Sequence, residues 1–309
     1  AKEGAIVVAA DKNQETAGCT AKAIRTARGT AISLAADVSV PEDCQKQVDV
    51  AVERFGRIDI VINNAGVGFH RLFLETTLED WNRVIGINLT GGFLTAQAAA
   101  RIMVDQGGGR IVNIGSISGQ RGGTGRSAYG ASKAAIMQLT RVMAVELAPV
   151  GIAVNAIAPG PIQTPLTNHG PAQNKAYLDR IPARTYGSTD ATTAAAIFLA
   201  SDEAQFIHGT TLNVDGGFNA AGLIFNTDEI TSYQSGPLRK LARRITQRAR
   251  WVFKQVSTSP HAGSRPHHRA HAHDRIQDSY RNSGDVPGRS TGVCQSRTFQ
   301  HNTCAPPPS

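Results

Sequence analysis

The chain has 309 residues and a formal net charge of +8 at neutral pH. Residues 1–221 hold 19 basic and 19 acidic residues, whereas residues 222–309 hold 13 basic and 5 acidic residues, so the whole net charge lies in the second segment. No run of about 18 apolar residues predicts a membrane span. The four cysteines lack the spacing of a disulfide framework, and we therefore expect a cytoplasmic protein.

Strand and helix patterns alternate along the first half of residues 1–221. Residues 4–11 are an apolar run that predicts a strand ending in an acid, and residues 41–55 carry their apolar side chains on one helical face. Residues 58–66 predict a buried strand that breaks into a turn. Thr76 and Glu79 have the spacing of a capping box ahead of a helix over 81–89.

Two further buried strands are expected over residues 109–116 and 151–160. Strands that alternate with helices predict crossover connections and a doubly wound parallel sheet of the α/β class. Ligands of such sheets bind at the carboxyl ends of the strands. Asn64, Ser116 and the turn Pro159-Gly160 all fall at such ends, so we expect one site there.

Tyr129 and Lys133 are the pair that most clearly indicates chemistry. They are four residues apart, and residues at this spacing share one face of a helix. A fixed ammonium favours the phenolate and lowers the pKa of a tyrosine, which could then exchange a proton with an alcohol or carbonyl oxygen. Ser116 can donate a hydrogen bond to the same oxygen. Alone, the pair is equally a surface tyrosine and a solvated lysine, and the surrounding motifs favour chemistry.

The motifs, in their order and spacing from about Gly4 to about Ala221, resemble the short-chain dehydrogenase/reductase family, and within it the 3-oxoacyl-(acyl carrier protein) reductases. The matching pieces are Asp37-Val38, Asn63-Asn64-Ala65-Gly66, Asn88, Ser116, Tyr129 to Lys133, Pro159 to Thr164, Phe198 to Asp202, and Val214 to Gly217. The resemblance implies a Rossmann-like fold and an NAD(P)-dependent oxidoreductase. The implied enzyme would interconvert a small secondary alcohol and the corresponding ketone.

The resemblance also implies a role for each matching residue. Tyr129 would be the general acid–base, and Lys133 would lower its pKa and hold the nicotinamide ribose. Ser116 would orient the substrate oxygen, and Asn88 would hold a water in a proton relay to Lys133. The implied cofactor contacts are Asp37 and Val38 at the adenine, Asn64, Ala65 and Gly66 at the ribose, Ile162 and Thr164 at the carboxamide, and the Pro159-Gly160 turn.

Each of these residues has a plainer alternative. Asn88 is equally an ordinary helix asparagine, Asp37 a turn or cap residue, and Pro159-Gly160 a simple turn. Asp11 ends its strand, where an acid in dinucleotide folds binds the ribose hydroxyls and repels a 2′-phosphate. It favours NAD over NADP, although Lys12 weakens that preference and Asp11 could simply begin a solvated turn.

The glycine-rich turn that opens the family, with its strand and helix, is not found in this sequence. About 30 residues of a βαβ unit are therefore expected to be missing, among them the backbone that would hold the pyrophosphate and the central first strand of the sheet. We therefore hypothesise that this chain is a fragment of an enzyme. The alternative is a catalytically inactive chain, or a non-enzymatic protein that senses a cofactor or interacts with a partner.

Residues 222–309 are expected to be a disordered basic tail, because they hold too few apolar residues to offset the entropy of folding. A short basic helix over 237–254 could bind an acidic membrane or partner, the arginines could bind nucleic acid, and His267, His268, His271 and His273 could bind a metal. None of these is favoured: a translated shifted frame is the preferred hypothesis, and no specific nucleic acid, membrane or metal partner is expected.

The resemblance implies a homo-oligomer, a tetramer or dimer, built on the helices near residues 89–105 and 129–148. The small side chains of Ala96–Ala100 would allow close helix approach, or would pack internally. Residues 164–184 are expected to form a substrate lid, whose composition is too general to name a substrate. His169 in this segment is a weak candidate for a substrate contact.

Overall fold

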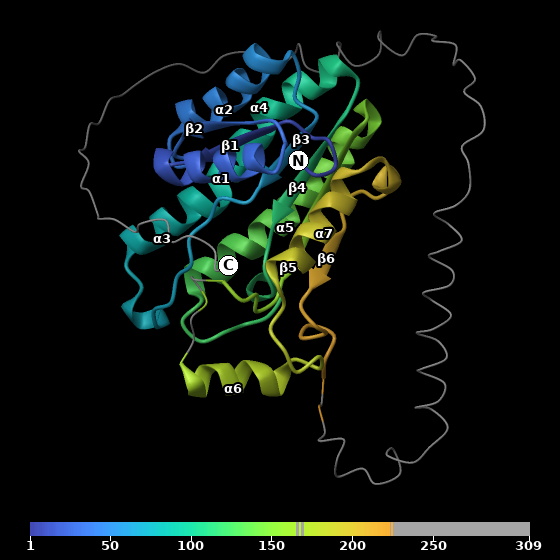
Figure 1. Ribbon diagram of the computed structural model, residues 1–309. Coiled ribbons are helices and arrows are strands. Elements are labelled where there is room, and N and C mark those ends of the chain that lie inside the picture. Colours follow the sequence, from blue (N-terminus) through green and yellow to red (C-terminus); the bar gives the residue numbers. More distant parts are fainter. Residues whose placement is uncertain (165–166, 168–169, 223, 225–309) are drawn as a thin grey trace, which may run out of the picture. The chain divides into compact units, whose positions relative to one another are not determined.

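Six parallel strands and their connecting helices form the part of the chain that the computed structural model describes, residues 1–164, 167, 170–222 and 224 (Figure 1). The strands are β1 (Val7–Asp11), β2 (Ala31–Ala35), β3 (Ile60–Asn63), β4 (Gly109–Ile114), β5 (Ile152–Pro159) and β6 (Thr211–Val214). The α-helices are α1 (Gln14–Thr26), α2 (Pro41–Phe55), α3 (Leu78–Ile85), α4 (Gly91–Gln106), α5 (Ser127–Leu147), α6 (Pro171–Arg180) and α7 (Thr189–Ala200). Single turns at Phe73–Glu75, Ile117–Gly119, Ala148–Val150 and Asp202–Ala204 are 3₁₀-helical, and Gly86–Thr90 is a π-helix.

The strands belong to two sheets. β1 pairs with β2, and β3, β4, β5 and β6 pair in that order. Every pair is parallel, with Ile111 opposite both Val61 and Val154 across the middle of the larger sheet. The α/β class and the Rossmann-like parallel arrangement predicted from the sequence are therefore confirmed.

β1 and β3 do not pair with each other among the described residues, so each leaves one edge open. The side chains of Ile6, Ile60 and Ile62 are 54%, 39% and 42% exposed beside these edges. Buried parallel strands normally have apolar cover on both faces. From the sequence we expected the central first strand of the sheet to be missing, so that the two strands beside it would lack their shared neighbour. β1 and β3 are the two strands at that position.

Helix α2 packs against α4, and it also contacts β1, so it links the two sheets (Figure 1). The first residue of α4 makes the closest approach. A Cβ placed on Gly91 would lie 2.4 Å from the backbone oxygen of Val38, in the loop between β2 and α2. Only a glycine allows this contact, because the Cβ of any other residue would clash with the oxygen at this distance.

The largest apolar cluster lies between α4 and the larger sheet. Ala96, Ala99 and Met103 of α4 are fully buried with Ile111 of β4 and Val154 of β5. The alanine-rich stretch of α4 therefore packs internally over much of its length, which was one of the two uses expected for it. This packing fixes the positions of β3 and β4, whose carboxyl ends carry candidate site residues.

Most predicted elements are present with small shifts at their ends. The capping box was predicted one residue too early: the Thr77 hydroxyl accepts from the backbone N–H of Asp80 at 3.1 Å, and the Asp80 carboxylate caps the backbone N–H of Thr77. The Thr76 hydroxyl instead donates to the backbone oxygen of Leu72 at 3.0 Å. In the lid segment, α6 is described, whereas residues 165–166 and 168–169, including His169, lie outside the described residues.

The predictions for residues 225–309 also lie outside the part of the chain that the structure describes. Among the described residues, no helix is long and apolar enough to cross a membrane, and no cluster of three or more potential metal ligands is found.

Candidate active site

Lys133 is the centre of the candidate site. It lies on the fifth helix, α5, with only 5% of its surface exposed, and its Nζ donates to the backbone oxygen of Ile114 at 2.7 Å. Burial lowers the pKa of Lys133 to about 8. About nine in ten of these side chains remain protonated at pH 7 with such a pKa. The structure therefore holds a buried cation at the carboxyl end of β4.

Tyr129 lies one helical turn before Lys133, as the spacing predicted. The Lys133 Nζ is 5.9 Å from the centre of the Tyr129 ring, and the guanidinium carbon of Arg126 is 5.4 Å from the same ring. The phenol is therefore close to two cations.

Ser116 lies two residues after the end of β4 and is 7% exposed. Its backbone is extended, and its hydroxyl oxygen accepts from the backbone N–H of Ser118 at 3.1 Å. This contact orients the hydroxyl and leaves its proton available, because a serine hydroxyl accepts and donates at once. Ser116 lies two residues after Ile114, whose carbonyl accepts the hydrogen bond from Lys133.

Asn88 lies in the π-helix Gly86–Thr90 and is 4% exposed. Its side-chain oxygen accepts from the backbone N–H of Val67 at 2.8 Å, and its side-chain nitrogen donates to the Val67 oxygen at 3.0 Å. The same nitrogen donates to the Ser132 hydroxyl at 3.2 Å, which in turn donates to the Tyr129 backbone oxygen at 2.8 Å. Asn88 thus ties the loop after β3 to the first turn of α5. A relay water is compatible with the remaining lone pair of its oxygen.

Gly66 passes between the side chains of Asn88 and Lys133. A Cβ placed on Gly66 would lie 3.2 Å from the Asn88 Oδ1 and 3.5 Å from the Lys133 Nζ. The backbone after β3 can lie this close to the ammonium because residue 66 has no side chain. Asn64 and Ala65, which precede it, are exposed on the same turn.

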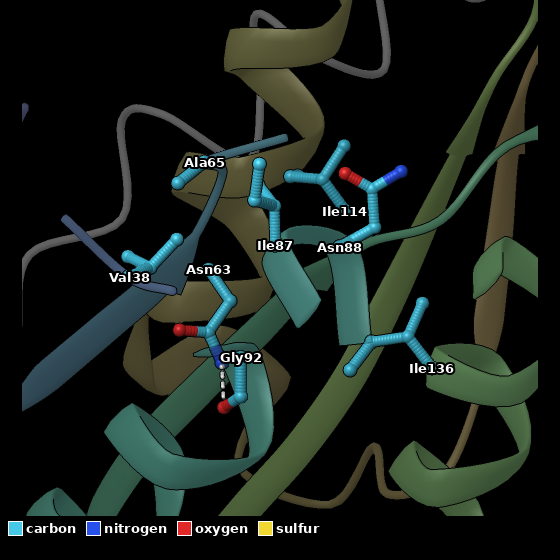
Figure 2. A pocket seen from close by; sticks show the side chains of 8 residues that line it. All are labelled: Val38, Asn63, Ala65, Ile87, Asn88, Gly92, Ile114 and Ile136. Carbon is cyan, nitrogen blue, oxygen red and sulfur yellow. Dashed lines mark hydrogen bonds between the residues drawn. The ribbon is translucent and has the colours of Figure 1, made fainter. Parts of the chain in front are cut away.

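A hollow lies at the carboxyl ends of β2, β3 and β4, and Figure 2 shows the eight side chains around it. Its empty volume, including the solvent at its mouth, is about 280 Å³. Val38 and Ala65 were predicted to contact the cofactor and Asn88 to hold a relay water, and the structure brings the three residues together here. The sequence missed five lining residues, Asn63, Ile87, Gly92, Ile114 and Ile136.

Asn63 is the most informative of the missed residues. Its side-chain nitrogen donates to the Gly92 backbone oxygen at 3.0 Å and to the Asn113 side-chain oxygen at 2.8 Å, as the dashed line to Gly92 in Figure 2 indicates. Asn113 then donates to the buried Thr140 hydroxyl at 2.8 Å. The doubled asparagine at positions 63 and 64 was the available signal, but only its second member was counted as a site residue.

The two predicted acids at the adenine end are held in turns. An oxygen of Asp11 accepts from the backbone N–H of Asn13 at 2.8 Å, and an oxygen of Asp37 accepts from the backbone N–H and the hydroxyl of Ser39 at 2.9 and 2.7 Å. Partial burial raises the pKa of Asp37, but these two hydrogen bonds and the charge of Lys12 outweigh it and hold the pKa below its usual value. Both acids therefore have the plainer turn role, and each keeps a second oxygen for a ligand.

The segment after β5 forms a further group of predicted residues. Pro159 ends β5 beside Val214, and Gly160 lies so close to Asp215 that an added Cβ would be 2.7 Å from the Asp215 Cα. Ile162 pairs with Gly187, and the Thr164 backbone N–H donates to the Thr167 hydroxyl at 2.9 Å. No hydrogen bond described here joins this group to Tyr129 or Lys133.

A nicotinamide cofactor fits the ribose end of the site. An ammonium has three protons to donate, and among the described residues Lys133 uses one of them, on Ile114. The remaining donors, beside the side-chain-free backbone of Gly66, suit vicinal hydroxyl groups. The residues that would hold the cofactor are Lys133, Tyr129 and the turn of residues 64–66, with Val38 and the two acids toward the adenine.

The chain is similar to known proteins in sequence and in fold. Residues 1–219 match the family described as enoyl-(acyl carrier protein) reductase. The 3-oxoacyl-[acyl-carrier-protein] reductase of Thermotoga maritima is 36% identical over 218 residues, which cover 70% of this chain and 89% of that protein.

Two crystal structures have the same fold. A gluconate 5-dehydrogenase from Burkholderia cenocepacia in complex with NADP and tartrate is 35% identical, with a TM-score of 0.69, over 72% of this chain and 88% of that one. A 7 alpha-hydroxysteroid dehydrogenase complexed with NADH and 7-oxo glycochenodeoxycholic acid is 32% identical, with a TM-score of 0.67, over 69% and 84%. Since the family pattern covers more than half of the chain, the chain belongs to the short-chain dehydrogenase/reductase family of NAD(P)-dependent oxidoreductases and is similar to its 3-oxoacyl-(acyl carrier protein) reductases.

Proposed function

We propose that this protein interconverts a secondary alcohol and a ketone, with Tyr129 as the general acid–base. The observation that carries the proposal is the buried Lys133 ammonium, one helical turn from Tyr129 and 5.9 Å from its ring. A buried charge is costly unless it is paired and hydrogen-bonded, and Lys133 has a single backbone acceptor among the described residues, so a functional role would explain why this lysine is kept.

In the direction of reduction, the Tyr129 hydroxyl gives its proton to the substrate oxygen as the carbonyl becomes an alcohol. A bound nicotinamide cofactor supplies the hydride that goes to the carbonyl carbon. Lys133 stabilises the phenolate that Tyr129 leaves behind, and the Ser116 hydroxyl donates to the same substrate oxygen. Asn88 holds the first turn of α5 through Ser132 and so keeps Tyr129 in place.

NAD is the proposed cofactor, because Asp11 ends β1 with a free carboxylate oxygen that would repel a 2′-phosphate. The two related structures hold NADP in one case and NADH in the other, so the family accommodates both. The remaining predicted contacts, Asp37, Asn64, Pro159, Gly160, Ile162 and Thr164, are proposed to surround the same cofactor.

The substrate is proposed to be a small carbonyl compound or the corresponding alcohol. The related proteins bear names for 3-oxoacyl, gluconate and hydroxysteroid substrates. We also propose a homo-oligomer that forms through α4 and α5. Its support is a set of exposed apolar side chains on these helices, Phe93, Val104, Val142 and Val145.

The deciding experiment compares the protein with its Tyr129→Phe variant. Oxidation of NADH and NADPH is followed with a panel of ketones, and binding of both cofactors is measured in parallel. We expect Tyr129→Phe to lose at least about 100-fold in kcat, the range of general acid–base catalysis, while the cofactor still binds through Lys133 and the turn of residues 64–66. Tyr177→Phe is the matched control on α6. Equal turnover by both variants, or cofactor binding without turnover by the unaltered protein, would reject Tyr129 as the acid–base and favour a cofactor-sensing role.

A further inference from the structure

Arg126 is a second cation at the proposed catalytic tyrosine. It immediately precedes α5, and its guanidinium carbon is 5.4 Å from the centre of the Tyr129 ring. The side chain is half-buried, and its Nη1 donates to the backbone oxygen of Phe69 at 3.3 Å. A backbone bridge between Arg71 and Arg126 holds the two segments together. The guanidinium therefore has a defined position beside the reacting group.

The charge of Arg126 is not balanced by an acid in the described part of the chain. The ion pairs there are Arg57 with Asp59, Arg71 with Asp80, Arg110 with Asp202, and Lys175 with Asp179. A guanidinium has five N–H donors, and Arg126 uses one of them in a long hydrogen bond. Its neighbour Arg71 is neutralised by Asp80, whereas Arg126 is left with a planar set of donors next to Tyr129.

We propose that Arg126 binds a carboxylate of the substrate, so that the substrate class is a short oxo acid or hydroxy acid. The planar fork of a guanidinium matches the two oxygens of a carboxylate. Because Arg126 lies so close to the Tyr129 ring, the substrate carboxylate must be only a few bonds from the carbonyl or alcohol carbon of the substrate. This inference rests on the proposed function and names the substrate class of the same site.

The competing explanation is structural, because the hydrogen bond to Phe69 could make Arg126 a tie between two loops. The two explanations differ in their dependence on ligand charge. A structural tie affects every ligand alike, whereas a carboxylate site discriminates a free acid from its ester. The guanidinium remains charged at all relevant pH values, so the discrimination should persist until the acid itself is protonated, near pH 4.

The test uses two matched ligands, 3-hydroxybutanoate and its methyl ester, with inorganic phosphate as a third probe. Calorimetric binding in the presence of NADH or NAD is measured for the unaltered protein, Arg126→Gln, Arg126→Lys and Arg141→Gln. Arg141 is the charge-matched control on the same helix, about 22 Å further along its axis. Where turnover is found, KM and kcat for 3-oxobutanoate and its methyl ester are measured as well.

We expect Arg126→Gln to weaken binding of the acid about 10- to 100-fold and to leave the ester unchanged, with partial recovery in Arg126→Lys. Arg141→Gln should bind both ligands normally. Equal weakening of acid and ester, or no preference of the unaltered protein for the acid, would overturn the proposal. Tighter binding of phosphate than of the acid would also overturn it. Acid binding that depends on Arg126 in a protein without turnover would uphold the carboxylate site while the proposed catalysis fails.

Discussion

The buried ammonium of Lys133 has consequences for stability as well as for chemistry. Its carbon chain and charge are enclosed by the backbone of β4 and the turn after β3, with one backbone acceptor described. Desolvation without an acidic partner disfavours the charged form, which is why its pKa falls to about 8. The same side chain therefore lowers the stability of the folded protein while it supports the proposed proton transfer.

This cost predicts a specific pH dependence. Between about pH 8 and pH 10.4 the unfolded chain keeps a proton that native Lys133 has lost, so the free energy of unfolding should rise with pH. The rise is on the order of 3 kcal/mol over that window. Lys133→Met should remove it and be the more stable form at pH 7. Urea unfolding at several pH values measures the slope.

Lys175→Met is the control, because Lys175 is exposed and paired with Asp179 on α6. It should retain the rise that Lys133→Met has lost. If both variants have the pH slope of the unaltered protein, the ammonium is not desolvated as the structure indicates.

At the scale of elements, the contact between α4 and the loop after β2 depends on one glycine. Gly91→Ala would place its methyl group 2.4 Å from the Val38 oxygen, so α4 and that loop must separate. Overpacking of this kind costs about 1–3 kcal/mol. We expect that loss in chemical denaturation, together with weaker cofactor binding, because Val38 and Gly92 line the hollow.

Gly18→Ala in α1 is the matched control, since nothing lies within 4 Å of its added Cβ. Alanine is favoured over glycine within a helix by up to about 1 kcal/mol, so this variant should be neutral or stabilised. A Gly91→Ala variant as stable as Gly18→Ala would mean that the two elements do not approach so closely.

Four of the six described strands were predictable, because each is a short apolar run bounded by turn residues, whereas β2 and β6 were not predicted. The helix start at Thr77 was missed by one residue, because Thr76 and Thr77 have equivalent sequence signals and only the folded backbone places the Asp80 N–H at the Thr77 hydroxyl. The π-helix around Asn88 had no sequence signal at all. The π-helix joins α3 to α4 where these elements pack against α5, and this packing brings Asn88 to Ser132, 44 residues away.

For the whole molecule, the open edges of β1 and β3 predict a pattern of amide exchange. In parallel strands alternate N–H groups point to opposite neighbours. The Val7 N–H donates toward β2, so the N–H groups of Val8 and Ala10 point to the open edge, as do those of Ile60 and Ile62 in β3. These amides should exchange much faster than those of Val61 and Asn63.

Hydrogen exchange followed by NMR or mass spectrometry resolves this pattern. Protection of the four edge amides equal to that of their neighbours would mean that another strand covers the gap in solution. The internal standard is β4, whose strand is paired on both sides.

The proposed oligomer gives a second prediction for the whole molecule. Val145 of α5 is 78% exposed and lies on the same helix as the half-exposed Val142. If α4 and α5 form the subunit interface, Val145→Glu should yield a smaller species in size-exclusion chromatography with light scattering. Leu74→Glu, which changes an even more exposed apolar residue away from these helices, should not. A monomeric unaltered protein would contradict the proposed interface.

The sequence by itself determined the parallel α/β class, the helical turn between Tyr129 and Lys133, and the family, because these depend on local periodicity and short motifs. Only the tertiary structure decided that Lys133 is buried against Ile114 and Gly66, that Asn63 and Ile136 line one hollow, and that β1 and β3 do not pair. Those properties come from contacts between residues tens of positions apart, whose burial and hydrogen bonding no local pattern specifies. Arg126 is the clearest case, because no sequence motif marks it. Only the structure shows that its guanidinium lies beside the Tyr129 ring and that no acid pairs with it among the described residues.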